Sequence, residues 1–487
     1  MASSQLRGGG SGSTTAVVEV EMQPMPTATP PVSHPKHTAA APELGYWDTN
    51  EAGKDRSEKT PAADIATAKG AGAVEVEIKQ RWNYPRGNIP RVAACFYAFV
   101  VCGLNDAAYG PLIPYLQEFY GLSYLVVSLI FLSPFVGIHM RVGQRGVAIG
   151  ASASHLVAYI IIALHPTYPG LVVAFALAGF GNGICDAAWN AFIGNMDRAN
   201  ELLGFLYGLY GAGAVVSPLV ATALITKAGL PWYYFYYIMI GLATLEIVVA
   251  TTSFWTATAL EYRETVAKSA GSATGGGLRE ALLKKPGARV TWLCAVFLLG
   301  YVGVEVSLGG WIIEFMIRVR HGGAFQSGLT ATGFWLGLTV GRFVLGFITP
   351  RIGEKLAIMI YLPITLGFEL LFWLVPQFIV SAVAIGLQGF FIGPLFPAAI
   401  VAMSKLLPRH LHVGAIGFAA ALGGSGAAFL PFAVGAIAQA KGVQVLQPII
   451  LALLAASFAV WCGLPRIEKK KDCESGLPGS SDGLYTP

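Results

Sequence analysis

The second half of this chain repeats the first half. Shifting the sequence against itself brings glycines and prolines of long apolar stretches into register. The aligned pairs include Gly103 with Gly303, Gly110 with Gly310, Gly213 with Gly426, and Pro218 with Pro431. A membrane chain built from two similar bundles of helices usually carries its binding site between the bundles, near the middle of the bilayer. The repeat therefore predicts a transporter with two pseudo-symmetric halves.

The composition is that of a membrane protein. Of the 487 residues, 54% are hydrophobic and 12% are charged, and the mean hydropathy is +0.59. A soluble chain carries about 25% charged residues, and a membrane-spanning helix needs about 20 apolar residues. Stretches of this kind predict an all-α membrane protein with twelve transmembrane helices in two six-helix pseudo-repeats. The predicted spans are 92–116, 122–139, 146–164, 170–194, 203–227 and 233–258, then 290–316, 327–349, 356–375, 377–403, 412–438 and 443–464.

Composition and charge divide the rest of the chain. Residues 1–88 are rich in Ala, Pro, Ser, Thr and Gly, so we expect a disordered tail. We expect 259–289 to link the bundles 89–258 and 290–464, and 465–487 to form a second tail.

Lys and Arg are concentrated in the loops on one side, which predicts that both termini are cytoplasmic. The net charge of +5 follows from this bias and requires no nucleic acid. We expect a monomer in the lipid bilayer, at the plasma membrane rather than the vacuolar membrane.

Neither a cofactor nor catalytic chemistry is expected. Five of the six cysteines lie in predicted spans and Cys473 lies in the second tail, without the sequence spacing of a metal site. We interpret them as buried reduced thiols, so no metal is expected. The sequence has no nucleophile–base pattern, so we do not expect an enzyme. The predicted energy source is a proton gradient.

A charged loop follows the eighth predicted span. The segment Gly341–Lys355 reads Gly-Arg-Phe-Val-Leu-Gly-Phe-Ile-Thr-Pro-Arg-Ile-Gly-Glu-Lys. Arg342 lies inside the span, where a lone charge costs about 2.5–3.5 kcal/mol, so it should have a partner. Arg351 and Lys355 follow in a short loop. The segment resembles the signature loop of the major facilitator superfamily, with Pro350 in place of the usual acid.

The first half contains a weaker copy of this loop. It includes Arg141, Gly143 and Arg145, with Met140 at the position of the acid. In the superfamily this loop gates the cytoplasmic side of the transporter. The resemblance therefore implies gating roles for Arg141, Arg145, Arg342, Arg351 and Lys355.

Two further motifs narrow the resemblance. One is Asn105-Asp106 in the first span, and the other is 179–190 in the fourth, Gly-Phe-Gly-Asn-Gly-Ile-Cys-Asp-Ala-Ala-Trp-Asn. Together they resemble the fucose–proton symporter-like branch of the superfamily, particularly its fungal members, over residues 90–465. In that branch an acid on the first span and an acid on the fourth serve proton coupling and substrate binding. These positions are occupied here by Asp106 and Asp186.

The same two carboxyl groups stand out by their position alone. Asp106 and Asp186 lie well inside apolar spans, where the loss of water favours the protonated form of a carboxyl group. A carboxyl group that changes charge between two conformations can couple proton flow to solute flow. Asn182, Asp186 and Asn190 are spaced four apart and share one helix face, whereas the equivalent positions of the second half are apolar. A purely structural pairing with a neighbouring helix is the alternative for both acids.

The superfamily resemblance also assigns the other polar residues of the spans. It places the first, fourth, seventh and tenth spans around a central cavity. The predicted solute ligands on these spans are Asn105, Asn182, Trp189, Asn190, Glu305 and Gln388. Trp189 could stack on the apolar face of a sugar. For the peripheral acids Glu246 and Glu369 we expect structural pairing. We expect His155 to be a hydrogen-bonded core histidine, and Tyr207 and Tyr210 to be core aromatics.

The second predicted span is unusually short. Its apolar run, 122–138, has 17 residues, close to the lower limit for crossing the bilayer core. His139 follows where the family pattern expects further small residues. We therefore hypothesise that this chain lacks the cytoplasmic third of the span, a change that would affect the first gating loop and transport itself.

These patterns predict a secondary active transporter that moves a small polar solute with protons by alternating access. A sugar-like solute follows from the branch resemblance alone. Proton-driven efflux of a metabolite or drug is one alternative, because the glycine–proline pattern of Gly204–Thr222 resembles superfamily antiporters. A non-transporting membrane sensor is the other alternative, which the short second span and the long N-terminal tail permit.

Overall fold

The structure is a computed structural model that describes residues 80–135, 143–194, 196–257, 277–408 and 411–465. This described part consists of helices and their connections, with one isolated bridge between Arg81 and Tyr84 in place of any strand. Eleven of the helices are long and apolar enough to cross a membrane. The predicted all-α membrane fold is therefore confirmed, and eleven of the twelve predicted spans have a matching helix.

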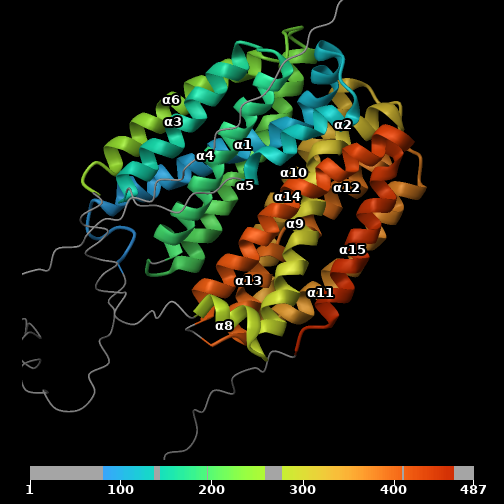
Figure 1. Cartoon of the computed structure of the whole chain (residues 1–487). Coiled ribbons are helices and arrows are strands. Elements are labelled where there is room, and N and C mark those ends of the chain that lie inside the picture. The colour runs from blue at the N-terminus through green and yellow to red at the C-terminus, as the bar shows by residue number, and fades with distance from the viewer. Residues whose placement is uncertain (1–79, 136–142, 195, 258–276, 409–410, 466–487) are drawn as a thin grey trace, which may run out of the picture. The chain divides into compact units, whose positions relative to one another are not determined.

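The long helices fall into two groups along the chain (Figure 1). Those of the first half are α1 (Asn88–Tyr120), α3 (Gly143–Ala163), α4 (Tyr168–Gly194), α5 (Ala199–Thr226) and α6 (Tyr234–Ser253). Those of the second half are α9 (Gly287–Arg318), α10 (Ala324–Ile352), α11 (Glu354–Leu374), α12 (Phe378–Ile392) with its continuation α13 (Leu395–Leu406), α14 (His412–Lys441) and α15 (Leu446–Cys462). Two short elements, α8 (Gly277–Leu283) and η4 (Val443–Val445), precede α9 and α15.

The second predicted span differs from the others. Its described part is a short α-helix, α2 (Tyr124–Val127), followed by a 3-10 helix, η1 (Ser128–Phe135). At about 1.5 Å per α-helical residue and 2.0 Å per 3-10 residue, they extend over about 22 Å, whereas the hydrocarbon core is about 30 Å thick. Residues 136–142 lie outside the described residues, so the loss of this span's end stays a prediction.

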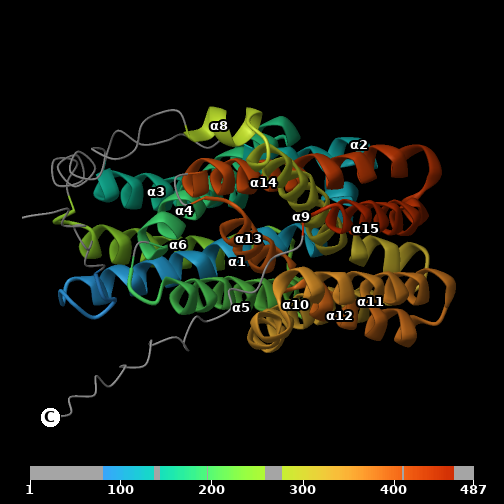
Figure 2. The same ribbon diagram turned by 90° about the horizontal axis from the view of Figure 1, so that it is seen from below.

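Glycines bring helix backbones into direct contact within each half. In the first, α1 and α5 lie side by side (Figure 2), and a Cβ atom on Gly213 would collide with the carbonyl oxygen of Val100. In the second, α10 packs on α12, where a Cβ on Gly341 would collide with the carbonyl oxygen of Phe390. Small residues allow such approach where lipid surrounds the helices and offers no hydrophobic driving force between them. Gly213 and Gly341 are therefore packing residues.

The two halves also touch each other. The backbones of α1 and α9 meet at Gly110 and Gly309. The short α2 contacts the second half through Tyr124, whose backbone N–H donates to Gln439 Oε1 at 2.9 Å. The Tyr124 hydroxyl donates to Glu314 Oε1 at 3.0 Å. The short second span thus supplies polar contacts between the halves.

Candidate functional site

Asp106 of α1 sits among neutral hydrogen-bond donors. Its Oδ1 accepts from the side-chain amides of Asn105 at 3.1 Å and of Asn182 at 2.6 Å. Its Oδ2 accepts from the Tyr210 hydroxyl at 3.0 Å. No cationic side chain of the described residues forms an ion pair with it within 4.0 Å. These donors come from α1, α4 and α5, so the carboxyl group joins three helices of the first half without a counter-ion.

Asp186 of α4 is exposed although its helix is long and apolar enough to span a membrane. Asn190, one turn later, donates from Nδ2 to Asp186 Oδ1 at 3.1 Å and to the Asp186 carbonyl oxygen at 2.9 Å. Asp186 interacts electrostatically with Asp106 and with Arg342 of α10. The Asp186 carboxyl group is therefore exposed, and it interacts with charged groups of both halves.

Glu305 of α9 has the strongest partner in the site. Its Oε1 forms an ion pair of 2.9 Å with Nη2 of Arg342, and both side chains are about nine-tenths buried. The Tyr301 hydroxyl donates to the other oxygen, Oε2. Arg342 Nε donates to the Gly393 carbonyl oxygen at 3.3 Å, and the guanidinium carbon is 6.0 Å from the Tyr207 ring centroid. The expected partner of Arg342 is thus Glu305.

The remaining predicted gating residues lie away from this pair. Lys355 Nζ donates to the carbonyl oxygen of Leu464, and Arg351 is exposed. The Arg145 guanidinium carbon is 3.6 Å from the Trp255 ring centroid. Arg141 lies outside the described residues. The structure therefore separates Arg342, which is in the middle of the site, from the loop residues with which the sequence pattern grouped it.

Two predicted solute ligands point elsewhere. The Trp189 side chain is 2% exposed and stacks on Phe254, with ring centroids 4.7 Å apart. Gln388 is fully buried and donates from Nε2 to Glu369 Oε2 at 2.8 Å. Both residues are on the predicted helices, but their side chains face a neighbouring helix of the same half. This geometry favours packing and pairing roles over solute contact.

The expected pairing residues have the partners they need. Glu369 pairs with Gln388, and His155 Nδ1 lies 2.9 Å from Glu246 Oε2, with both side chains buried. Tyr210 and Tyr301 are the site residues that sequence reasoning missed. Tyr301 precedes Glu305 by one helical turn, and this spacing could have indicated their contact. Tyr210 reaches Asp106 because α5 packs on α1, and no local sequence pattern indicates that packing.

Comparison with known proteins identifies the family. The family model described as Major Facilitator Superfamily matches residues 95–316 and 306–481. Bypass of stop codon protein 6 of Saccharomyces cerevisiae is 30% identical over 78% of this chain and 83% of that protein. The glucose/mannose transporter GlcP of Bacillus subtilis is 22% identical over 64% of this chain and 79% of its own length. The glucose/galactose transporter of Brucella abortus is 24% identical over 73% of this chain and 88% of its own length.

Solved structures share the fold. A D-xylose-proton symporter superposes with a TM-score of 0.62 at 14% identity, over 77% of this chain and 98% of that one. The human organic anion transporter MFSD10 superposes with a TM-score of 0.55 at 13% identity, over 77% and 99% of the two chains. At these identities the likeness concerns the fold alone. Together with the family match, it shows that this chain is a multi-pass membrane protein of the major facilitator superfamily, a family of transporters rather than enzymes.

Proposed function

We propose that this protein moves a small, sugar-like solute together with protons, by alternating access to the space between its two halves. The observation that carries the proposal is Asp186, an exposed carboxyl group on a helix long and apolar enough to span a membrane, which interacts electrostatically with Arg342 of the other half. Relatives named as glucose transporters support a sugar-like solute.

Asp106 is suited to hold a proton in one state and release it in another. Ionised, it accepts three hydrogen bonds from neutral donors. The Oδ1 atoms of Asn105 and Asn182 are buried without a hydrogen-bond partner. Because an amide carries a donor and an acceptor on one plane, rotating either amide would offer an acceptor to the protonated acid. The group can therefore be satisfied in both protonation states, and Asp186 would exchange the proton with solvent.

Unpartnered polar atoms next to these acids are suited to sugar hydroxyl groups. Arg342 Nη1 is buried without a hydrogen-bond partner, like Asn182 Oδ1. A hydroxyl group can accept from the first and donate to the second. Unpaired buried polar groups cost about 1–3 kcal/mol each, so a solute that satisfies them gains affinity. Two further predicted solute ligands lie nearby, because Asn190 hydrogen-bonds Asp186 and Glu305 pairs with Arg342.

We further propose that both termini are cytoplasmic and that the protein lies in the plasma membrane. Labelling of tagged termini on intact cells would test this.

Reconstitution into vesicles tests the proposal. We would trap a pH-sensitive dye inside and add glucose, mannose, galactose and xylose in turn. The expected result is sugar-dependent proton entry that Asp186→Asn abolishes, while exchange of labelled sugar across the membrane persists. Asp197→Asn is the matched control, because Asp197 lies outside the site and faces Arg81 at 3.7 Å.

Other outcomes separate the alternatives. Proton entry that accompanies solute exit would indicate efflux, which the glycine–proline pattern of the fifth span favours. Sugar flux that is independent of pH in the wild-type protein would contradict proton coupling. A folded protein that moves no solute would contradict transport and support the sensor.

A further inference from the structure

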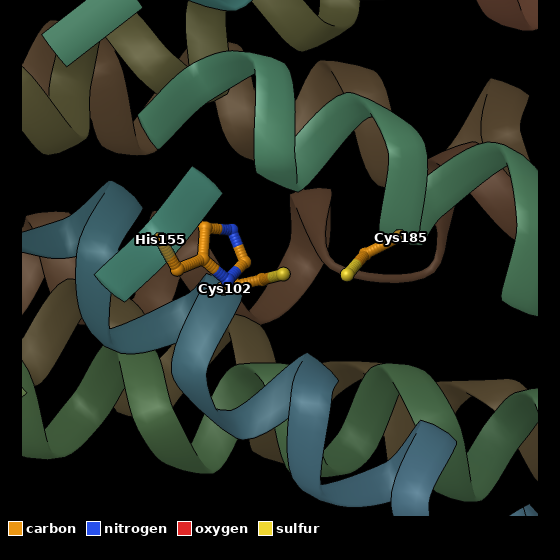
Figure 3. A group of neighbouring side chains, drawn as sticks. All are labelled: Cys102, His155 and Cys185. Carbon is orange, nitrogen blue, oxygen red and sulfur yellow. The ribbon is translucent and has the colours of Figure 1, made fainter. Parts of the chain in front are cut away.

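Three buried side chains with metal-ligating atoms meet inside the first half, next to the site proposed for the solute. They are Cys102 of α1, His155 of α3 and Cys185 of α4, and their ligand atoms all lie within 4.8 Å of one another. Figure 3 shows the imidazole ring and the two sulfur atoms directed toward a common space. Their exposures are 5%, 0% and 0%. The three helices thus bring two thiols and one imidazole together in the buried interior of the first half.

The surroundings of His155 resemble those of a metal-bound histidine. Its Nδ1 lies 2.9 Å from Oε2 of Glu246 in α6, and Glu246 is 1% exposed. The other carboxylate oxygen, Oε1, is 4.0 Å from Cys185 Sγ. Histidines that bind metal ions commonly hydrogen-bond a carboxylate in this way, which fixes the ring and strengthens the ligand. Gly181 gives the ring its room, because a Cβ atom there would come within 2.7 Å of His155 Nε2.

We propose that Cys102, Cys185 and His155 bind one soft, thiophilic metal ion of the Zn²⁺ or Cu⁺ class. Thiolate and imidazole ligands select these ions over Mg²⁺ and Ca²⁺, which prefer oxygen. Zn–S and Zn–N bonds of about 2.3 and 2.0 Å place ligand atoms about 3.5–4 Å apart. Atoms within 4.8 Å of one another therefore reach an ion by small movements of their side chains. The two thiols release their protons on binding, so their charge offsets that of the ion.

The ion would stiffen the helix turns that carry the acids of the proposed transport site. Cys102 precedes Asp106 by one helical turn, and Cys185 immediately precedes Asp186. A metal ion at this place cross-links α1, α3 and α4, and Glu246 adds α6 through its hydrogen bond to His155. The ion would thus fix the first half as a unit. Spacing along the chain does not reveal this cluster, because its ligands come from three separate spans.

Metal content tests the proposal directly. The full-length protein would be purified in detergent under reducing conditions and stripped of metal with a chelator. It would then be loaded with Zn²⁺ or Cu⁺, and its metal content would be measured by elemental mass spectrometry. We expect about one ion per chain in the wild-type protein and a loss of at least tenfold in Cys102→Ser/Cys185→Ser. Cys294→Ser is the matched control, because Cys294 is equally buried but lies in α9. It should retain the wild-type ion.

Cobalt gives a second measurement that does not depend on the variants. Co²⁺ bound by thiolates shows a sulfur-to-metal charge-transfer absorption, which we expect in the stripped wild-type protein and expect Zn²⁺ to displace. A folded wild-type protein that takes up neither ion and shows no such band would overturn the proposal. So would a double variant that keeps its full metal content. In either case the cysteines and histidine are packed core residues.

Discussion

Each half of the molecule has an intramembrane carboxyl group at nearly the same position of the repeat, but the two groups have different hydrogen-bond partners. In the first half, Asp106 is held by two amides and a hydroxyl. In the second, Glu305 is held by Arg342 at 2.9 Å. A buried carboxylate that loses its arginine partner is left as an uncompensated charge, which costs about 3–5 kcal/mol. The first half therefore relies on neutral hydrogen-bond donors at this position, and the second half relies on an ion pair.

The same two halves agree in packing at some pairs of repeat positions and differ at others. A Cβ on Gly213 would collide with Val100, and a Cβ on its repeat partner Gly426 would collide with Leu299. Gly204 and its repeat partner Gly417 both have open space at that position. At Gly103, by contrast, a Cβ would collide with the backbone of Tyr210, whereas at its repeat partner Gly303 it would collide with the side chain of Leu430. The repeat has thus kept part of its helix contacts while its polar groups have diverged.

Breaking the ion pair of the second half should have the largest effect. Arg342→Gln leaves Glu305 as a buried acid with Tyr301 as its remaining hydrogen-bond donor, and we expect a loss of about 3–5 kcal/mol in the free energy of unfolding. The measurement is the thermal unfolding midpoint of the purified protein in detergent. Glu305→Gln/Arg342→Gln removes both charges and should recover much of the loss. Equal midpoints for the single and double variants would show that the pair is not the origin of the effect.

Filling the helix contacts should have a smaller effect that is equal in the two halves. Gly213→Ala and Gly426→Ala each force two backbones apart, for which we expect about 1–3 kcal/mol of destabilisation. The same change at Gly204 and Gly417 meets open space and should be neutral or slightly stabilising, because alanine favours helix over glycine by about 1 kcal/mol. Thermal midpoints of the four variants give the test. Different responses at the two tight positions would mean that the repeat does not extend to packing.

Neutralising the acid of the first half should have the smallest effect on stability. In Asp106→Asn the side-chain oxygen still accepts from Asn182 or Tyr210, so we expect a loss of less than about 1 kcal/mol. Glu305→Gln is the comparison, since it leaves Arg342 without its counter-ion and should cost more. Both variants would be compared by thermal midpoint. If Asp106→Asn proves as destabilising as Glu305→Gln, then Asp106 is ionised for structural reasons and is unsuited to proton exchange.

The helices were predictable from the sequence because long apolar runs in a membrane chain have few alternatives. The predicted span 356–375 coincides with α11, which runs from Glu354 to Leu374. The shortness of the second span stays a prediction, because residues 136–142 lie outside the described residues. The contact of Tyr124 with the second half was not predictable, because it depends on how α2 is positioned against α9 and α14.

The site was predictable in part. Asp106, Asp186, Glu305 and Arg342 stood out because a charge inside an apolar span needs a reason. The directions of Trp189 and Gln388 were not predictable, because the sequence places a residue on a helix without fixing which neighbour its side chain faces. The meeting of Cys102, His155 and Cys185 was hidden for the same reason. Such clusters depend on packing between spans, and spacing along the chain carries no trace of it.

The contact between Gly110 and Gly309 has a consequence for how the halves can move. Gly110 is the repeat partner of Gly310, so equivalent turns of the two halves meet here. If the halves rock about this contact, each residue is displaced in proportion to its distance from it. A few degrees of rocking would leave these glycines touching while the far ends of the helices sweep through several ångströms. Spectroscopic labels should therefore report motion at the helix ends and stillness here.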